Sequence, residues 1–248
     1  MRECGYVAAM RSWMAAAFVL AAACGGEVDA GEGRAVAEEA RPGLHPALED
    51  TVFTRVLPAM EAIPLERRSE LLRLSTFVRN RIDAGEPARL TFICTHNSRR
   101  SHMAQVWAAT AAAWYGIEGV ETYSGGTEAT AFNPRAVAAL ERAGFEIANP
   151  GGDNPRYRVR FGPDAPPLTC FSKVTSESPN PREGFAAIMT CSAADEACPI
   201  VDGAALRVSI PYIDPKEADD TPEETARYDA RSLQIAAEMF YLMSRVRE

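Results

Sequence analysis

The chain has 248 residues, of which 47% are hydrophobic and 24% are charged, with 17 glycines and 17 prolines. This is the composition of a globular protein with enough apolar side chains for a core, and it excludes collagen-like, coiled-coil and wholly disordered chains. The 26 Lys and Arg residues against 34 Asp and Glu residues give a formal net charge of −8. Because general nucleic-acid binders are basic, we expect no nucleic-acid partner.

A short apolar stretch follows Arg11 at residues 14–23. It is too short to span a bilayer and fits the hydrophobic region of a signal peptide. It runs into Cys24 and is similar there to the lipobox at which bacterial signal peptidase cuts before a lipid-carrying cysteine. We expect a lipoprotein signal peptide at residues 1–23, lipidation of Cys24 and a lipid-anchored protein that faces the periplasm. A cytoplasmic protein is the alternative.

Residues 24–44 are rich in Gly, Ala and Glu and poor in aromatic residues, which predicts a flexible linker. Residues 45–84 hold two stretches with apolar side chains at helical spacing, and Gly85 ends the second. Those side chains are Leu48, Val52, Val56, Leu57 and Met60 in the first stretch, and Leu65, Leu71, Leu72, Leu74, Phe77, Val78 and Ile82 in the second. We predict an N-terminal helical hairpin packed on the main domain, with a partner-binding surface as the alternative.

Short apolar runs alternate with helical patterns through the main domain at residues 85–248. The runs predict strands at residues 90–93, 120–123, 185–190 and 206–210. Helices are predicted at residues 101–115 and 134–143 and from a capping box at Thr221 to the C-terminus, and Asn133 is the N-cap of the second. Strands separated by helices imply right-handed crossovers, so the expected fold is α/β with a parallel four-stranded sheet flanked by helices.

Residues 149–182 interrupt this alternation and contain seven prolines. Proline cannot donate to a strand ladder, so we predict a long, irregular surface excursion. An edge strand at residues 168–171 is the alternative.

The segment after the first predicted strand carries the clearest chemistry: Cys94-Thr95-His96-Asn97-Ser98-Arg99-Arg100-Ser101. It joins a strand to a helix N-terminus, where backbone N–H groups converge on an anion and the helix dipole adds positive potential. The planar guanidinium of Arg100 is suited to gripping two oxygens of a tetrahedral oxyanion. The same field favours the thiolate of Cys94, and Ser101 is placed to donate a hydrogen bond to its sulfur. We predict an oxyanion site formed by residues 95–101.

These motifs resemble the low-molecular-weight protein-tyrosine-phosphatase superfamily, and more closely its thioredoxin-coupled arsenate reductases. The resemblance implies that Cys94 is the nucleophile, Arg100 the oxyanion clamp and Asn97 a loop-stabilising residue. Two residues depart from the family pattern: His96 stands where glycine is usual, and Arg99 stands where a second cysteine is common.

A second pair of cysteines, Cys191 and Cys198, follows the predicted strand at residues 185–190. In the family, cysteines at this spacing relay oxidation away from the nucleophile. The resemblance implies that Cys191 attacks a Cys94–arsenic adduct, that Cys198 then attacks Cys191, and that a thioredoxin-like dithiol protein reduces the final disulfide. A static disulfide between the pair is the alternative, and two thiols without a nearby histidine supply too few ligands for a metal site.

The dipeptide Asp214-Pro215 precedes the C-terminal helix. In the family an aspartate here is the general acid that protonates the departing oxygen. The alternative is a turn aspartate before proline. Lys216 and Glu217 follow, where family phosphatases often carry aromatic side chains for a phosphotyrosine ring.

The remaining candidates predict structure rather than chemistry. Cys170 has no motif around it and is expected to be buried, and His102 is expected to face solvent. The sequence thus predicts a cofactor-free enzyme that attacks a small oxyanion through Cys94, by arsenate reduction or by hydrolysis of a phosphomonoester. A non-catalytic oxyanion-binding or redox-sensing lipoprotein is the third alternative.

Overall fold

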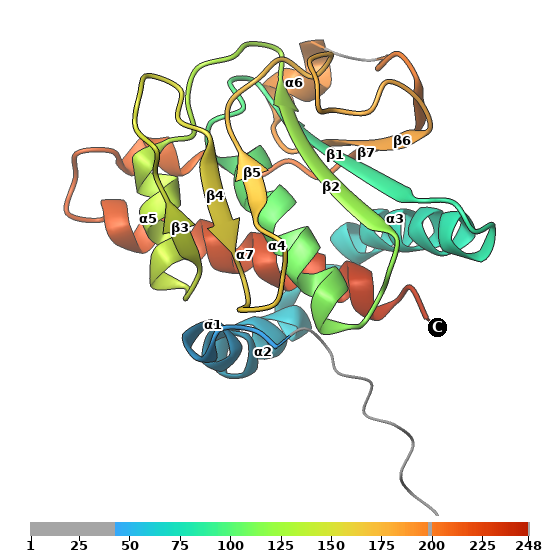
Figure 1. Ribbon diagram of the computed structural model, residues 1–248, viewed down its shortest axis with the longest axis horizontal. Helices are drawn as coiled ribbons and strands as arrows, with labels where there is room; N and C mark the ends of the chain where they lie inside the picture. Colours follow the sequence, from blue (N-terminus) through green and yellow to red (C-terminus); the bar gives the residue numbers. More distant parts are fainter. Residues whose placement is uncertain (1–42, 198–199, 248) are drawn as a thin grey trace, which may run out of the picture. The chain divides into compact units, whose positions relative to one another are not determined.

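A parallel four-stranded sheet forms the centre of the protein (Figure 1). The computed structural model describes residues 43–197 and 200–247, which lie within one compact unit. The strand order is β2-β1-β6-β7, and every neighbouring pair is parallel. The strands are β1 (Ala88–Cys94), β2 (Val120–Gly126), β6 (Phe185–Met189) and β7 (Ala204–Ser209). The predicted α/β fold is confirmed.

Strand β1 is covered on both faces because its side chains contribute to two apolar clusters. Leu90 and Phe92 belong to the larger core. Ile93 and Cys94 belong to a smaller cluster with Met189 and Cys191. This burial explains why the strand is an almost continuous apolar run. It also places Cys94 at the carboxyl edge of the sheet, where ligands of parallel sheets bind.

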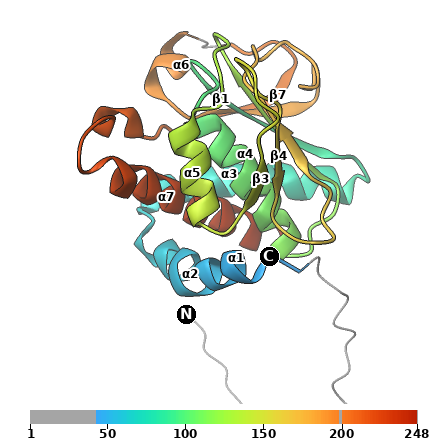
Figure 2. The same cartoon turned by 60° about the vertical axis from the view of Figure 1, so that its left-hand side comes forward.

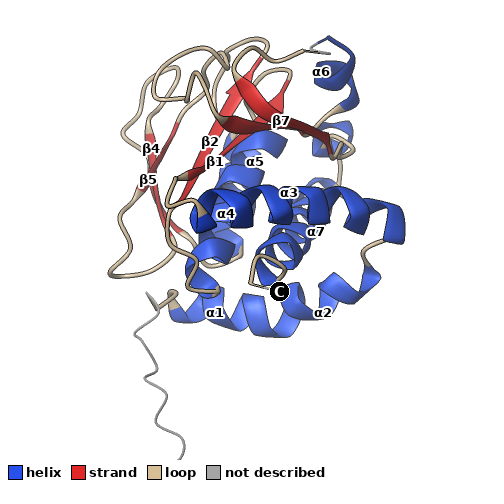
Figure 3. Ribbon diagram, turned by 90° about the vertical axis from the view of Figure 1, so that its right-hand side faces the viewer, coloured by secondary structure: helices blue, strands red, loops and turns tan. Residues whose placement is uncertain are grey.

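Helices cover the two faces unequally, as Figure 3 shows. Helices α3, α4 and α7 lie on one side of the strands, and the short α6 lies on the other. Their bounds, with those of α5, are α3 (Leu65–Asp83), α4 (Arg100–Trp114), α5 (Pro134–Arg142), α6 (Ser192–Ala197) and α7 (Glu224–Ser244). The N-cap prediction for α5 is confirmed, because the Asn133 Oδ1 accepts a hydrogen bond from the Arg135 N–H at 2.9 Å.

The N-terminal region is helical, as the sequence predicts. Before α3 the chain passes through α1 (Pro46–Thr51), a π-helical turn η1 (Val52–Val56), α2 (Leu57–Ala59) and a 3₁₀ turn η2 (Met60–Ala62). The Ser75 hydroxyl of α3 donates to the Leu242 carbonyl of α7 at 2.8 Å. The prediction was wrong for Leu65 and Leu72, which are 81% and 42% exposed, because the buried face of α3 carries Leu71, Leu74 and Val78 instead.

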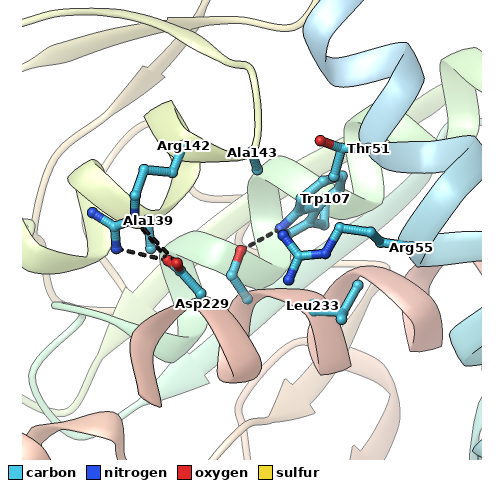
Figure 4. A pocket seen from close by; sticks show the side chains of 9 residues that line it. Thr51, Arg55, Trp107, Ala139, Arg142, Ala143, Asp229 and Leu233 are labelled. Atoms are coloured by element: carbon cyan, nitrogen blue, oxygen red, sulfur yellow. Dashed lines mark hydrogen bonds and ion pairs between the residues drawn. The ribbon is translucent and has the colours of Figure 1, made fainter. Parts of the chain in front are cut away.

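Figure 4 shows the junction at which this N-terminal region meets the helices of the main domain. The Trp107 indole N–H donates to the Ser232 hydroxyl at 2.9 Å, and Arg142 forms an ion pair with Asp229 at 2.7 Å. Nearby, Gly144 has a φ of +107°, and a Cβ there would overlap the backbone of Leu48. The start of α1 therefore lies directly against the turn after α5.

Residues 149–182 contain more regular structure than we predicted. Strands β3 (Glu146–Ala148), β4 (Tyr157–Arg160) and β5 (Leu168–Cys170) form a second, antiparallel sheet (Figure 2). The edge strand predicted at residues 168–171 is confirmed as β5. Residues 149–156, 161–167 and 171–182 are irregular, as predicted. The prediction missed only β4, a strand of four residues with buried Tyr157 and Val159, which leaves little signal between prolines.

The predicted capping box at Thr221 is also wrong. Helix α7 begins at Glu224, and the Thr221 hydroxyl donates to the Ala218 carbonyl instead of to the helix N-terminus. The predicted signal peptide and the lipidated Cys24 lie outside the described residues, as does Cys198. In the part of the chain that the structure describes, no helix combines the length and the apolar character needed to cross a bilayer.

Candidate active site

Cys94 is the last residue of β1 and lies at the floor of the loop that leads into α4. Its side chain is 4% exposed. Its Sγ lies 3.1 Å from the Ser101 Oγ, which belongs to the first turn of α4. The loop therefore closes on itself, with the sulfur and the hydroxyl meeting at its base.

The backbone of this loop presents its two kinds of polar group in opposite ways. The carbonyl oxygens of Cys94, Thr95, His96 and Ser98 accept hydrogen bonds from neighbouring segments, and that of Arg99 accepts from the Met103 N–H within α4. Within the described residues, none of the N–H groups of residues 95–101 donates to a protein acceptor. A run of unpaired N–H groups at a helix N-terminus is an anion-binding concavity. The N–H groups of the loop are thus available as donors to an anion.

Asn97 fixes the shape of this concavity. It has a φ of 43°, in the left-handed region that asparagine tolerates better than most residues. Its Nδ2 donates to the Ser101 Oγ at 2.9 Å, and its Oδ1 accepts from the Lys173 N–H at 3.0 Å. Its side chain therefore ties the loop to the excursion that follows β3.

Strand β2 and the excursion support the outer side of the loop. The Gly126 N–H donates to the Lys173 carbonyl, and a Cβ on Gly126 would lie 2.7 Å from the Asn97 nitrogen, so glycine is required there. The Ser172 hydroxyl donates to the His96 carbonyl at 2.9 Å. His96 keeps a negative φ, and its ring is 45% exposed beside Glu128. The loop therefore accommodates His96 without left-handed backbone at that residue.

Arg100 points its guanidinium toward the segment that follows β7. Its Nη1 donates to the Tyr212 carbonyl at 2.9 Å, and its Nη2 donates to the Asp214 Oδ2 at 2.7 Å. Its Nε is buried and has no hydrogen-bond partner among the described residues. An unpaired buried donor is costly, so this N–H is available to an anion in the loop.

Arg99, which we predicted to bind the oxyanion, directs its side chain elsewhere. Its Nε donates to the Tyr228 hydroxyl at 2.8 Å, and its Nη2 lies 3.3 Å from the Asp219 Oδ2. Burial raises the pKa of Tyr228 to about 12, and its hydroxyl in turn donates to Asp219 at 2.7 Å. The guanidinium of Arg99 is therefore part of a structural network. Only the backbone N–H group of Arg99 belongs to the set of unpaired donors at residues 95–101.

Asp214 sits between the two arginines. It accepts from Arg100 and lies 3.9 Å from the Arg99 Nε, and its Oδ1 accepts from the Lys216 N–H at 3.1 Å. That last bond caps the short 3₁₀ helix η3 (Pro215–Ala218). The predicted general acid is thus at the site, held as an ion pair with the predicted oxyanion clamp.

Cys191 follows β6 and is 1% exposed. Its Sγ lies 3.5 Å from the Thr95 Oγ1, and it accepts a hydrogen bond from the Ala194 N–H at 3.3 Å. Cys94 and Cys191 share the smaller apolar cluster, and both are free thiols. The structure thus places two of the three predicted relay cysteines in one buried cluster.

His102 is buried, and the prediction that it faces solvent was wrong. Its Nδ1 lies 3.1 Å from the Ser124 Oγ, and its ring stacks on Phe132 with a centroid separation of 4.2 Å. Burial lowers the pKa of His102 well below its ordinary value, and the charge of Lys173 adds to this effect. Cys170 is buried as predicted, and burial raises its pKa to about 12.

Several residues of the site carried no signal in the sequence. Ser172 and Lys173 reach the loop from an excursion that is distant in the chain, and Tyr212 holds Arg100 through a backbone carbonyl. The Thr190 hydroxyl donates to the Ile93 carbonyl at 2.9 Å, next to both cysteines. None of these contacts is local, so no spacing rule predicts them.

Comparison with known proteins shows what this chain is similar to. Residues 89–151 match the family model of the low molecular weight phosphotyrosine protein phosphatases. The arsenate reductase of Bacillus subtilis is 44% identical over 62 residues, which cover 25% of this chain and 42% of that protein. The arsenate reductase of Halalkalibacterium halodurans is 29% identical over 133 residues, which cover 54% of this chain and 78% of that protein.

The match is partial in extent. The chain spans less than half the length of several curated relatives, for example 44% of an arsenate reductase of Staphylococcus aureus. A solved low molecular weight phosphotyrosine phosphatase of Vibrio cholerae aligns with a TM-score of 0.45 at 14% identity, over 65% of this chain and 97% of that one. The segment that matches the family model contains the whole Cys94 loop, and the chain is similar to low molecular weight phosphotyrosine protein phosphatases over this segment and to proteins named arsenate reductase.

Proposed function

We propose that the protein is a cysteine-thiolate enzyme that acts on tetrahedral oxyanions, and that its reaction is the reduction of arsenate to arsenite. The loop amides and Arg100 hold the anion, and the Cys94 thiolate attacks its central atom. The single observation that favours reduction is the burial of Cys191 in the same cluster as Cys94, with its sulfur 3.5 Å from the Thr95 hydroxyl. A hydrolase does not need a second thiol at this position.

The first step forms a bond between the Cys94 sulfur and arsenic(V). One arsenate oxygen leaves as water, and Asp214 is the proton donor. In the structure this carboxylate is paired with Arg100 at 2.7 Å. The incoming anion competes with the carboxylate for the guanidinium, and a carboxylate released from that pair is free to take up the proton that it then donates.

The second step moves two electrons onto arsenic. The Cys191 thiolate attacks the Cys94 sulfur, a disulfide forms, and the electron pair of the sulfur–arsenic bond remains on arsenic, which leaves as arsenite. Two thiols are oxidised for each arsenate reduced. Cys198 then attacks the Cys191 sulfur, which frees the Cys94 thiolate, and a thioredoxin-like dithiol reduces the disulfide between Cys191 and Cys198.

Hydrolysis of a phosphomonoester is the second candidate. It uses the same attack by Cys94, with phosphorus in place of arsenic, and water then hydrolyses the cysteinyl-phosphate. The placement of Asp214 beside Arg100 favours it, because a departing alkoxide needs a proton donor at the mouth of the loop. The exposed Lys216 and Glu217 that follow offer no ring to a phosphotyrosine.

We propose that the protein is exported, and this location determines which dithiol protein can reduce it. The lipid anchor at Cys24 would put the relay in an oxidising compartment, where an exposed thiolate is readily oxidised. The burial of Cys94 and Cys191 supports a relay that survives there. The partner would then be a periplasmic dithiol protein of the thioredoxin kind.

Single-turnover chemistry separates the two reactions. Enzyme in excess over arsenate, without any external thiol, is expected to lose two thiols for each arsenite formed. Cys191→Ser is expected to form no arsenite and to retain hydrolysis of an aryl phosphate within about twofold. Cys170→Ser is the matched control, because Cys170 is equally buried but lies outside the cluster of Cys94 and Cys191. Arsenite formation by Cys191→Ser at the wild-type rate would exclude the relay.

A further inference from the structure

One backbone segment carries both groups that surround the mouth of the loop. Residues 210–214 follow β7 and hold the Tyr212 carbonyl, which accepts from Arg100, and the Asp214 carboxylate. The segment is joined to the sheet by the Ile210 N–H, which donates to the Met189 carbonyl at 2.9 Å, and by the Tyr212 N–H, which donates to the Thr190 carbonyl at 3.1 Å. Whatever fixes this segment therefore also fixes the guanidinium of Arg100.

Arg67, near the start of α3, contacts the segment at residues 210–214 from outside the sheet. Its Nη2 donates to the Pro211 carbonyl at 2.6 Å, and its guanidinium carbon lies 5.3 Å from the centroid of the Tyr212 ring. Its Nε lies 3.4 Å from the Glu238 Oε1, on α7. The Tyr212 hydroxyl donates to the Glu238 Oε2 at 2.6 Å. The arginine thus contacts the backbone, the ring and the hydrogen-bond partner of one short segment.

Burial makes this cluster depend on its arginine. The side chains of Glu238 and Arg67 are only 3% and 18% exposed. Burial raises the pKa of Glu238, and the charge of Arg67 acts most strongly against that effect. A buried carboxylate that loses its cation is strongly unfavourable. Removal of Arg67 is therefore expected to change the side-chain positions of Glu238 and Tyr212.

We propose that Arg67 is a positioning residue for the oxyanion site. It acts through Pro211 and Tyr212 on the guanidinium of Arg100, and it touches neither Cys94 nor the loop amides. Arg67 lies upstream of the segment at residues 89–151 that matches the family model. The N-terminal helical region therefore completes the anion site as well as covering the core. This inference rests on the proposed function only in requiring that an oxyanion binds in the loop.

The test compares Arg67→Gln with Arg68→Gln in the full chain. Arg68 is the next residue of the same helix, and it also lies over a tyrosine ring, that of Tyr241 at 5.4 Å. Its hydrogen bonds go to the Ile63, Met60 and Glu61 carbonyls and none of its contacts among the described residues reaches residues 210–214. The two variants therefore lose the same charge from the same helix, and only one of them loosens the Arg100 support.

The probe is inorganic phosphate, with its dissociation constant measured by calorimetry on protein that is folded by circular dichroism. Arg67→Gln is expected to weaken phosphate binding about tenfold or more, because the Arg100 guanidinium is then displaced from its hydrogen bond with the charged anion. Arg68→Gln is expected to stay within about twofold of the wild type. With an aryl phosphate, Arg67→Gln is expected to lower kcat as well as raise KM, since a displaced guanidinium serves the transition state less well than the ground state. A merely structural role would lower the melting temperature and leave these values unchanged.

Arg67→Lys tests the same inference without removing the charge that faces Glu238. A lysine does not reproduce the forked contact with both Pro211 and Glu238, so we expect phosphate affinity between those of the wild type and Arg67→Gln. If Arg67→Gln fails to fold, Arg67→Lys decides: reduced phosphate affinity supports the inference. Wild-type phosphate affinity in a folded Arg67 variant would overturn it. Failure of the wild type itself to bind phosphate or arsenate would instead overturn the proposed function.

Discussion

The Ser101 hydroxyl lies 3.1 Å from the Cys94 sulfur while it accepts a hydrogen bond from the Asn97 amide at 2.9 Å. Because the hydroxyl acts as the acceptor toward Asn97, its own proton is not used in that bond and can point at the sulfur. This arrangement stabilises a thiolate, and it links the nucleophile to the residue that shapes the loop.

Ser101→Ala removes this donor. We expect alkylation of Cys94 by iodoacetamide at neutral pH to be slower than in the wild type, and turnover at neutral pH to fall about tenfold or more. Ser75→Ala is the control, since Ser75 is an equally buried serine whose hydroxyl bonds to Leu71 and Leu242, far from the sulfur in the chain. An alkylation rate identical to that of the wild type would show that the hydroxyl does not act on the sulfur.

Asp214→Asn is expected to have opposite effects on chemistry and on binding. Loss of the general acid should lower kcat for an alkyl phosphate by about 10²- to 10⁴-fold. Loss of the negative charge 2.7 Å from the Arg100 Nη2 should strengthen the binding of inorganic phosphate, because the anion no longer competes with a carboxylate.

Asp220→Asn is the matched control for these opposite effects on kcat and on phosphate binding. Asp220 also pairs with an arginine, Arg135, but it is 86% exposed and has no contact with Arg100 among the described residues. Its φ of 62° is one that asparagine adopts readily. We expect little change in either quantity for the control. Parallel losses of kcat and of phosphate affinity in Asp214→Asn would contradict the ion-pair competition.

The buried His102 predicts how stability depends on pH. Burial lowers its pKa in the folded state, so below the ordinary value of 6.5 the unfolded chain binds a proton that the folded chain does not. The free energy of unfolding should therefore fall as the pH falls below about 6.5, by up to about 1.4 kcal/mol per pH unit from this residue. His102→Leu should lack this contribution. Denaturant titrations of both proteins between pH 7 and pH 5 provide the check, and curves that stay parallel would refute the assignment.

The part of the site that lies within one stretch of chain was readable from the sequence. The order strand, Cys94, polar loop, Arg100, helix fixes the position of the sulfur at a sheet edge and of the amides at a helix N-terminus. Both properties follow from local structure. The strand and helix patterns on either side were apolar and long enough to define the sheet around it.

Contacts between segments that are distant in the chain could not be predicted from the sequence. Ser172 contacts the loop and Tyr212 contacts Arg100, both from distant parts of the chain, and Arg67 contacts Pro211 beside Tyr212. Each of these hydrogen bonds uses a backbone carbonyl, which any residue supplies. His102 is predicted to face solvent from its place in the first turn of α4, but Phe132 and Ser124 enclose it. The short β3, β4 and β5 strands are likewise stabilised by tertiary contacts more than by propensity.

The most direct test of the account is the behaviour of Cys94→Ser, measured side by side for arsenate reduction and for aryl phosphate hydrolysis. Both reactions begin with attack by the Cys94 sulfur, so the account predicts that both are lost, while Cys170→Ser retains whichever activity the wild type has. Survival of either activity in folded Cys94→Ser would contradict the account, because the anion would then be attacked by some other group.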